Sequence, residues 1–257
     1  MHSRRCKHFY RRGIYFLLCA CFLVVLLHVK REQVVSAIYI NLDQRVDRKE
    51  VVEKELGRVN FPFMRLSAVN LSHNAPELMD CWDPDETRVC AGKIGCKLSH
   101  VAALDRALDL RARAVAIFED DFVWSPKVEP KFIPRIIMEV QSHFPNWSVI
   151  ALSVNPQILI VAQPFMRVLI GQDKYAKVMR IYSAQTTHAY VVKHQYIATL
   201  RSNFLACNVE RHSDAAIDRC WKTLQRIDEW YTFSPSLGTQ APGFSDIERR
   251  NVSYSIM

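Results

Sequence analysis

A short apolar run that ends in three acids, AVAIFEDD at residues 114–121, constrains the fold most strongly. An apolar stretch of this length between polar residues predicts a buried strand. Open α/β sheets bind their ligands at the carboxyl ends of the strands, which is where Glu119, Asp120 and Asp121 would lie. In a strand Glu119 and Asp121 share a face and Asp120 points to the other. Carboxylates there suit Mg²⁺ or Mn²⁺, whose coordination substrate phosphates usually share; a solvated acidic turn is the alternative.

Most of the excess positive charge lies at the N-terminus. The 257-residue chain has a formal net charge of +8, but residues 1–31 hold seven basic residues and no acid. The remainder has 27 basic and 26 acidic residues. Because this remainder is close to neutral, its charge gives no support for nucleic-acid binding.

The apolar run at residues 13–29 predicts a membrane anchor. As a helix it would span about 25 Å, close to the roughly 27 Å core of the endoplasmic reticulum membrane. Five basic residues precede it, which keeps residues 1–12 in the cytosol. No small-residue cleavage site follows, which argues against a cleaved signal peptide. We therefore expect a single-pass type II membrane protein of the Golgi or endoplasmic reticulum, with residues 30–257 in the lumen.

Sequons and cysteines agree with a luminal location. Three Asn-x-Ser sequons, which a lumen would open to N-glycosylation, begin at Asn70, Asn146 and Asn251. Five cysteines follow the anchor, so at least one has no partner within the chain. Two spacings allow small disulfide loops and leave Cys96 over, namely Cys81 with Cys90 and Cys207 with Cys220.

Strands and helices alternate along the rest of the chain, which predicts one α/β sandwich. We expect strands at residues 34–42, 61–69, 148–154 and 187–192, and helices at 132–144 and 194–205. A capping box of Asp47 and Glu50 would begin the first helix. Ser99 would be the N-cap of another helix, with His100 in its first turn as a positioning residue. A late helix would open at 213–214, and residues 155–180 would form a hairpin or lid.

Several segments, taken together, resemble glycosyltransferase family 25, the group that includes lipooligosaccharide and procollagen galactosyltransferases. The matching segments follow one another over almost the whole chain after the anchor: INLDQRVDR (40–48), FMRLSAV (63–69), GKIGCKLSH (92–100), AIFEDDF (116–122), HAYVV (188–192), the region of Asp214 and PSLGTQAPGFSDI (235–247). The resemblance implies a GT-A-type nucleotide-sugar-binding fold, a Rossmann-like α/β/α sandwich. It also implies an inverting transfer from a UDP-sugar, commonly UDP-galactose, to a glycan or glycoprotein hydroxyl.

The resemblance also implies roles for particular residues. The triplet would replace the Asp-x-Asp motif, with Glu119 and Asp121 holding Mn²⁺ or Mg²⁺. An inverting transfer needs a carboxylate base; Asp214 is the first choice, and Asp218 and Asp246 are the alternatives. We assign nine further motif residues to donor binding: Asn41, Asp43, Arg45, Arg48, Gly95, Ser99, His100, Asp120 and Gln240.

Two other functions compete with glycosyl transfer. The first is a family member without activity that serves as a luminal binding or adhesion protein; the complete acid triplet argues against it. The second is a metal-dependent phosphohydrolase. Such an enzyme usually needs Asp and His ligands for two metals, and the histidines of this chain are scattered.

Overall fold

The computed structural model describes residues 33–59, 62–71, 87–110, 112–207 and 216–253. The predicted anchor at 13–29, Cys81, Ser213 and Asp214 lie outside these ranges. Within them, no helix combines the length and the apolar character needed to cross a bilayer.

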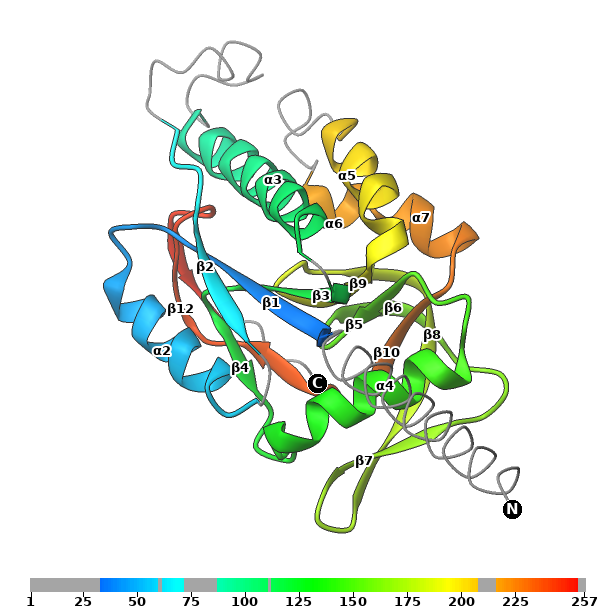
Figure 1. Ribbon diagram of the computed structural model, residues 1–257. Helices are drawn as coiled ribbons and strands as arrows, with labels where there is room; N and C mark the ends of the chain where they lie inside the picture. The colour runs from blue at the N-terminus through cyan, green and yellow to red at the C-terminus, as the bar shows by residue number, and fades with distance from the viewer. Residues whose placement is uncertain (1–32, 60–61, 72–86, 111, 208–215, 254–257) are drawn as a thin grey trace, which may run out of the picture.

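A nine-stranded mixed sheet forms the centre of the structure (Figure 1). Its strands run in the order β2-β1-β3-β9-β5-β10-β8-β6, and β7 pairs with β8. Their bounds are β1 Gln33–Asn41, β2 Phe63–Ser67, β3 Ala112–Glu119, β5 Val149–Ala151, β6 Asn155–Val161, β7 Arg167–Gly171, β8 Lys174–Gln185, β9 Ala189–Lys193 and β10 Trp230–Ser234. Strand β1 is parallel to both β2 and β3, whereas β9 runs antiparallel to β3. The predicted α/β class is therefore confirmed as a mixed α/β fold.

Helices cover both faces of the sheet, as Figure 1 shows. One face carries α3 Thr87–Leu108, α5 Ile197–Leu205, α6 Ile217–Cys220 and α7 Lys222–Ile227; the other carries α2 Val46–Leu56 and α4 Ile133–His143. Two 3-10 helices, η2 Pro130–Phe132 and η3 His194–Tyr196, precede α4 and α5. Successive residues of β3 enter opposite cores, Ala116 the α2 side and Ile117 the α3 side. Burial on both faces explains why β3 is a continuous apolar run.

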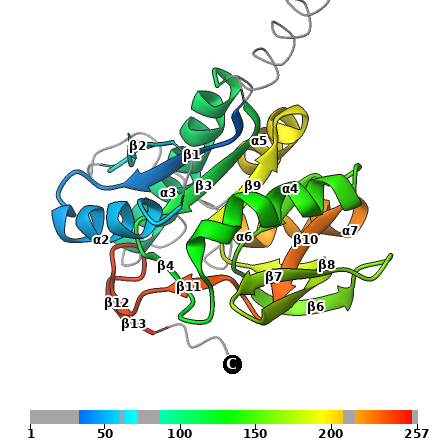
Figure 2. The ribbon, with the colours of Figure 1, turned by 60° about the horizontal axis from the view of Figure 1, so that its bottom comes forward.

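Two small sheets lie beside the main one. Strand β4 (Phe122–Trp124) pairs with β11 (Gly238–Gln240), and β12 (Gly243–Ser245) pairs with β13 (Arg250–Val252). Figure 2 shows these C-terminal strands gathered near β4. Because β4 follows the acid triplet directly, the C-terminal segment returns to the carboxyl end of β3.

Two predicted helix starts are wrong. Helix α3 begins at Thr87, so Ser99 and His100 lie well inside it. The Ser99 hydroxyl donates to the Gly95 carbonyl four residues earlier (2.6 Å), a bond that a serine within a helix can make. Helix α2 has Arg45 at its N-cap position without a side-chain cap bond. Asp47 pairs with Arg45 instead of capping the helix with Glu50.

Candidate active site

The carboxyl ends of β1 and β3 lie side by side, because Ile40 and Glu119 are register partners. A cavity of about 680 Å³ opens there. Asp43 and Arg45 do not line it. The other described residues that the sequence predicted for catalysis, metal binding or donor binding do, namely Asn41, Arg48, Gly95, Ser99, His100, Glu119, Asp120, Asp121, Asp218, Gln240 and Asp246.

Asp120 is committed to contacts within the protein. It accepts a hydrogen bond from Asn41 Nδ2 (2.8 Å) and one from Arg48 Nη1 (2.9 Å). Burial raises the pKa of Asp120, although Asn41 and Arg48 counteract the shift. Asp120 therefore joins the end of β3 to the end of β1 and the start of α2.

Glu119 faces the α3 side of the site. Its Oε1 accepts a hydrogen bond from the Thr187 hydroxyl (2.7 Å) and lies 3.1 Å from His100 Nε2. The other ring nitrogen of His100 is 3.1 Å from the Tyr190 hydroxyl. Burial raises the pKa of Glu119, but the hydrogen bond and charge of His100 outweigh it, so the net shift is downward. Glu119 is thus held as a carboxylate, with His100 and Thr187 as its partners.

One carboxylate oxygen of Asp121 has no hydrogen-bond partner among the described residues. Its Oδ2 accepts from Gln240 Nε2 (3.2 Å), and its backbone carbonyl accepts from Ala241 N (2.7 Å). Oδ1 is buried and has no hydrogen-bond partner among the described residues. Burial, followed by the negative charge of Glu119, raises the pKa of Asp121 to about 7. An unpaired buried carboxylate oxygen among like charges fits a bound cation, so these acids suit Mn²⁺ or Mg²⁺.

A different trio of side chains in the described part of the chain also has a spacing that could hold a metal ion. The ligand atoms of Cys96, His100 and Glu119 all lie within 4.8 Å of one another. However, burial raises the pKa of the Cys96 thiol well above its ordinary value. Since the thiolate is the metal-binding form, and His100 is already hydrogen-bonded to Glu119, this trio lacks the character of a prepared metal site.

Two residues predicted to bind the donor, the basic Arg45 and the acidic Asp43, face other partners. Arg45 forms ion pairs with Asp47 and Asp246. Asp43 accepts hydrogen bonds from Ser67 and from Arg65. Arg48, Lys93 and Arg249 line the cavity. These three are the described cations that an anionic ligand in the cavity would meet.

The glycines of the GKIGC segment allow close packing around the cavity. A Cβ on Gly95 would lie 2.6 Å from the Val69 carbonyl oxygen. A Cβ on Gly92 would lie 2.8 Å from Ile247 Cα. Gly95 therefore brings α3 against the segment after β2, and Ser99 strengthens this contact by accepting a hydrogen bond from Val69 N (2.8 Å).

The sequence did not single out several residues that organise the site. Arg65 donates to the Asn41 side-chain oxygen (3.0 Å), and Thr187 donates to Glu119. Thr186 has a φ of 73°, and its N–H donates to Asp218 Oδ2 (2.9 Å). Arg65 stands in the FMRLSAV segment, where its charge was a usable signal. The threonines carry no charge or motif that would mark them.

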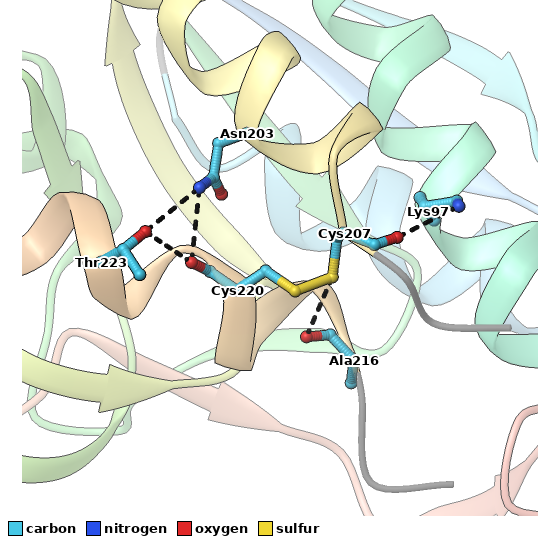
Figure 3. The surroundings of a disulfide bond; sticks show 6 residues. All are labelled: Lys97, Asn203, Cys207, Ala216, Cys220 and Thr223. Carbon is cyan, nitrogen blue, oxygen red and sulfur yellow. Dashed lines mark hydrogen bonds between the residues drawn. A yellow bond between two sulfur atoms is a disulfide. The ribbon is translucent and has the colours of Figure 1, made fainter. Parts of the chain in front are cut away.

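The cysteines follow the allowed pairing in the described ranges. Cys207 and Cys220 form a disulfide, shown in Figure 3, and Cys96 is free. Cys90 is also disulfide-bonded; Cys81, its expected partner, lies outside the described residues. Of the sequon asparagines, Asn146 and Asn251 are exposed, and Asn70 is exposed at the wall of the cavity.

Comparison with solved structures gives weak similarities. The crystal structure of A197 from STIV has 10% sequence identity and a TM-score of 0.41, covering 86% of this chain and 95% of that one. A glycosyltransferase involved in the glycosylation of the major capsid of PBCV-1 has 11% identity and a TM-score of 0.30, covering 65% of each chain. At these values neither likeness bears on activity. No curated protein matches the chain.

A family model does match. It covers residues 36–160, the range from β1 to β6 that contains Asn41, Arg48 and the acid triplet. This match supports a role in glycosyl transfer. Residues 36–160 match glycosyltransferase family 25 (LPS biosynthesis protein), the family that the sequence motifs predicted.

Proposed function

We propose that this chain transfers a sugar from a nucleoside diphosphate to a hydroxyl group of a glycan or glycoprotein, with inversion, in a GT-A-type fold. UDP-galactose is the first donor to test. The observation that carries the proposal is Asp121 Oδ1, which is buried without a hydrogen-bond partner among the described residues. It lies in a cavity with Glu119, within the range of the family match. That arrangement supports a cation and diphosphate site better than it supports a solvated acidic turn.

Glu119 and Asp121 would hold Mn²⁺ or Mg²⁺, and a bound cation there would neutralise charge on the leaving diphosphate as a Lewis acid. The chain's own residues do the rest. Thr187 and His100 orient Glu119. Gln240 orients Asp121.

The cations of the cavity wall would bind the diphosphate. Lys93 and Arg249 line the cavity, and Arg48 lies 4.0 Å from Asp121 as well as pairing with Asp120. Positive charges near the phosphates favour the developing negative charge of the transition state. The acceptor proton would pass to Asp214, Asp218 or Asp246. Of these, Asp246 already pairs with Arg45.

The location of the enzyme also belongs to the proposal. Residues 13–29 would anchor it in the Golgi or endoplasmic reticulum membrane with the catalytic domain in the lumen. The disulfide between Cys207 and Cys220 supports an oxidising compartment, because such bonds rarely persist in the cytosol.

The test is a screen of UDP-sugars for UDP release by the full chain, produced in a secretory host. We expect release with Mn²⁺ that EDTA stops and that Asp121→Asn lowers on the order of 100-fold. Asp109→Asn is the matched control, since Asp109 is an exposed residue that pairs with Arg106 and does not line the cavity, and it should retain full activity. If no donor is turned over and none binds by calorimetry, the enzyme proposal fails and a luminal binding or adhesion protein becomes the better account.

A further inference from the structure

Asp218 lies in the wall of the same cavity as the acid triplet. It is the second residue of α6, a place where an acid ordinarily serves as a helix cap or a dipole partner. Here α6 has Ala216 at its N-cap position and no side-chain cap bond. The Asp218 carboxylate instead accepts the Thr186 N–H (2.9 Å) from another element. Helix capping therefore does not explain its place.

The Thr186–Thr187 pair, which we call the threonine corner, connects two carboxylates. Thr186 donates its N–H to Asp218, and Thr187 donates its hydroxyl to Glu119 Oε1 (2.7 Å). Thr186 adopts a φ of 73°, a left-handed conformation that is strained for a β-branched residue. Such strain persists where surrounding contacts enforce it and is concentrated at functional sites. The corner thus sets Asp218 at a defined place relative to Glu119.

The residues that follow Asp218 are also fixed by bonds to other elements, some of which Figure 3 shows. Cys220, two residues later, is bonded to Cys207 at the end of α5, and Lys97 of α3 donates to the Cys207 carbonyl (3.2 Å). Trp221 is fully buried, and its indole N–H donates to the Ala184 carbonyl (3.1 Å). The residues that follow Asp218 are therefore fixed to the chain after α5 and to β8, the kind of support that a catalytic side chain requires.

The surroundings of Asp218 suit proton acceptance. Burial raises its pKa, and the negative charge of Glu119 adds to the rise, whereas the Thr186 N–H bond and the charges of Lys222 and Arg219 oppose it without reversing it. Asn155, Gln185 and Thr186 line the cavity with it, so a hydroxyl-rich ligand would meet hydrogen-bonding groups there. Asp246, in contrast, is already engaged in an ion pair with Arg45.

We propose that Asp218 accepts the proton of the attacking hydroxyl, and that Asn155, Gln185 and Thr186 form the acceptor side of the cavity. This inference rests on the proposed transfer and names its base. As the acceptor oxygen bonds to the anomeric carbon, its proton moves to the Asp218 carboxylate. The bond from that carbon to the diphosphate oxygen breaks, and its electron pair leaves with the nucleoside diphosphate. Asp218 then returns the proton to solvent.

The test uses azide, an anionic nucleophile that needs no base. Full-length wild type, Asp218→Asn, Asp214→Asn and the control Asp109→Asn are incubated with a UDP-sugar and Mn²⁺, and UDP release is measured with and without azide. UDP binding by calorimetry checks that each variant keeps its donor site. Asp218→Asn should lose on the order of 100-fold or more of its UDP release while binding UDP within about twofold of wild type. Azide should restore release and give the glycosyl azide.

The other outcomes would overturn the inference, assign the base to another residue or refute the proposed function. Release by Asp218→Asn at the wild-type rate would overturn the inference, as would a loss that azide does not restore. Azide-rescued loss in Asp214→Asn alone would assign the base to Asp214. If Asp218→Asn no longer binds UDP, Asp218→Glu takes its place; because it keeps a carboxylate it must retain partial release, and its complete loss with UDP binding intact would overturn the inference. A wild type that turns over no UDP-sugar would instead refute the proposed function itself.

Discussion

Arg48 and Asp120 form an ion pair, Nη1 to Oδ1 at 2.9 Å, between the first turn of α2 and the turn after β3. Only 18% of the Arg48 side chain and 10% of the Asp120 side chain are exposed. The other terminal nitrogen of Arg48 donates to the Phe244 carbonyl in β12 (2.6 Å). The Arg48 guanidinium therefore links α2 to the acid triplet and to the C-terminal segment.

Removing this guanidinium should be costly. We expect Arg48→Met to lower the free energy of unfolding by about 3 kcal/mol, because it leaves the buried Asp120 carboxylate without its charge partner. Arg48→Met combined with Asp120→Asn should lose at least 1 kcal/mol less than the sum of the single variants. Urea denaturation measures the cycle. Arg106→Met, at an exposed pair with Asp109, is the control and should cost under about 1 kcal/mol. Strict additivity would contradict a coupled pair.

Mn²⁺ should stabilise the protein against heat. Glu119 and Asp121 repel each other in the free protein, and a bound cation removes that repulsion. At a Mn²⁺ concentration of 100 times Kd, linkage gives about 2.7 kcal/mol, which for a chain of this size is a rise in Tm of roughly 5–10 °C. Scanning fluorimetry with Mn²⁺ and then EDTA measures the rise and its reversal. Asp121→Asn should abolish the rise, and an equal rise in that variant would place the cation elsewhere.

The buried imidazole of His188 should make stability depend on pH. Neither ring nitrogen has a hydrogen-bond partner among the described residues, and burial lowers the pKa of His188 to about 4. Between pH 4 and the ordinary value of about 6.5, His188 is protonated in the unfolded chain but neutral in the folded chain. The free energy of unfolding is therefore not reduced by this group above pH 6.5, and it falls as the pH drops, by about 2 kcal/mol at pH 5. Urea denaturation at pH 7 and pH 5 measures the loss. His188→Leu should show a smaller loss, and equal losses would contradict this origin.

Much of the fold could be predicted because its signals are local. The runs that became β1 and β3 are apolar since both faces are buried, and the helix expected at 132–144 is α4, with Pro134 in its first turn. The start of α3 could not be found that way. Glycines usually indicate a loop, yet Gly92 and Gly95 lie inside α3. Glycine is needed at these two positions because a Cβ would collide with Ile247 and Val69. Those contacts come from distant parts of the chain.

The site divides in the same way. The acid triplet could be predicted because an apolar strand ends there, and Asn41 because it ends the neighbouring strand. The ion pair between Arg45 and Asp246 joins residues 201 positions apart, and no local pattern contains it. The threonine corner depends on the left-handed backbone conformation of Thr186. Two adjacent threonines in a sequence do not predict that conformation. Tertiary pairing therefore decides which of the predicted polar residues face the cavity and which face each other.

Gly95 offers a test in which the usual effect of a substitution should reverse. Within a helix, Gly→Ala ordinarily stabilises by about 1 kcal/mol. In α3 the added Cβ would lie 2.6 Å from the Val69 carbonyl oxygen, so we expect Gly95→Ala to lower the free energy of unfolding by about 1–3 kcal/mol. It should also weaken UDP binding, because Val69 lines the cavity. Gly243→Ala is the matched control: its Cβ would have no neighbour within 4 Å, and its effect should stay within about 0.5 kcal/mol. Urea denaturation and calorimetry with UDP measure the two effects, and a Gly95→Ala protein as stable as wild type would show that α3 does not press against the segment after β2.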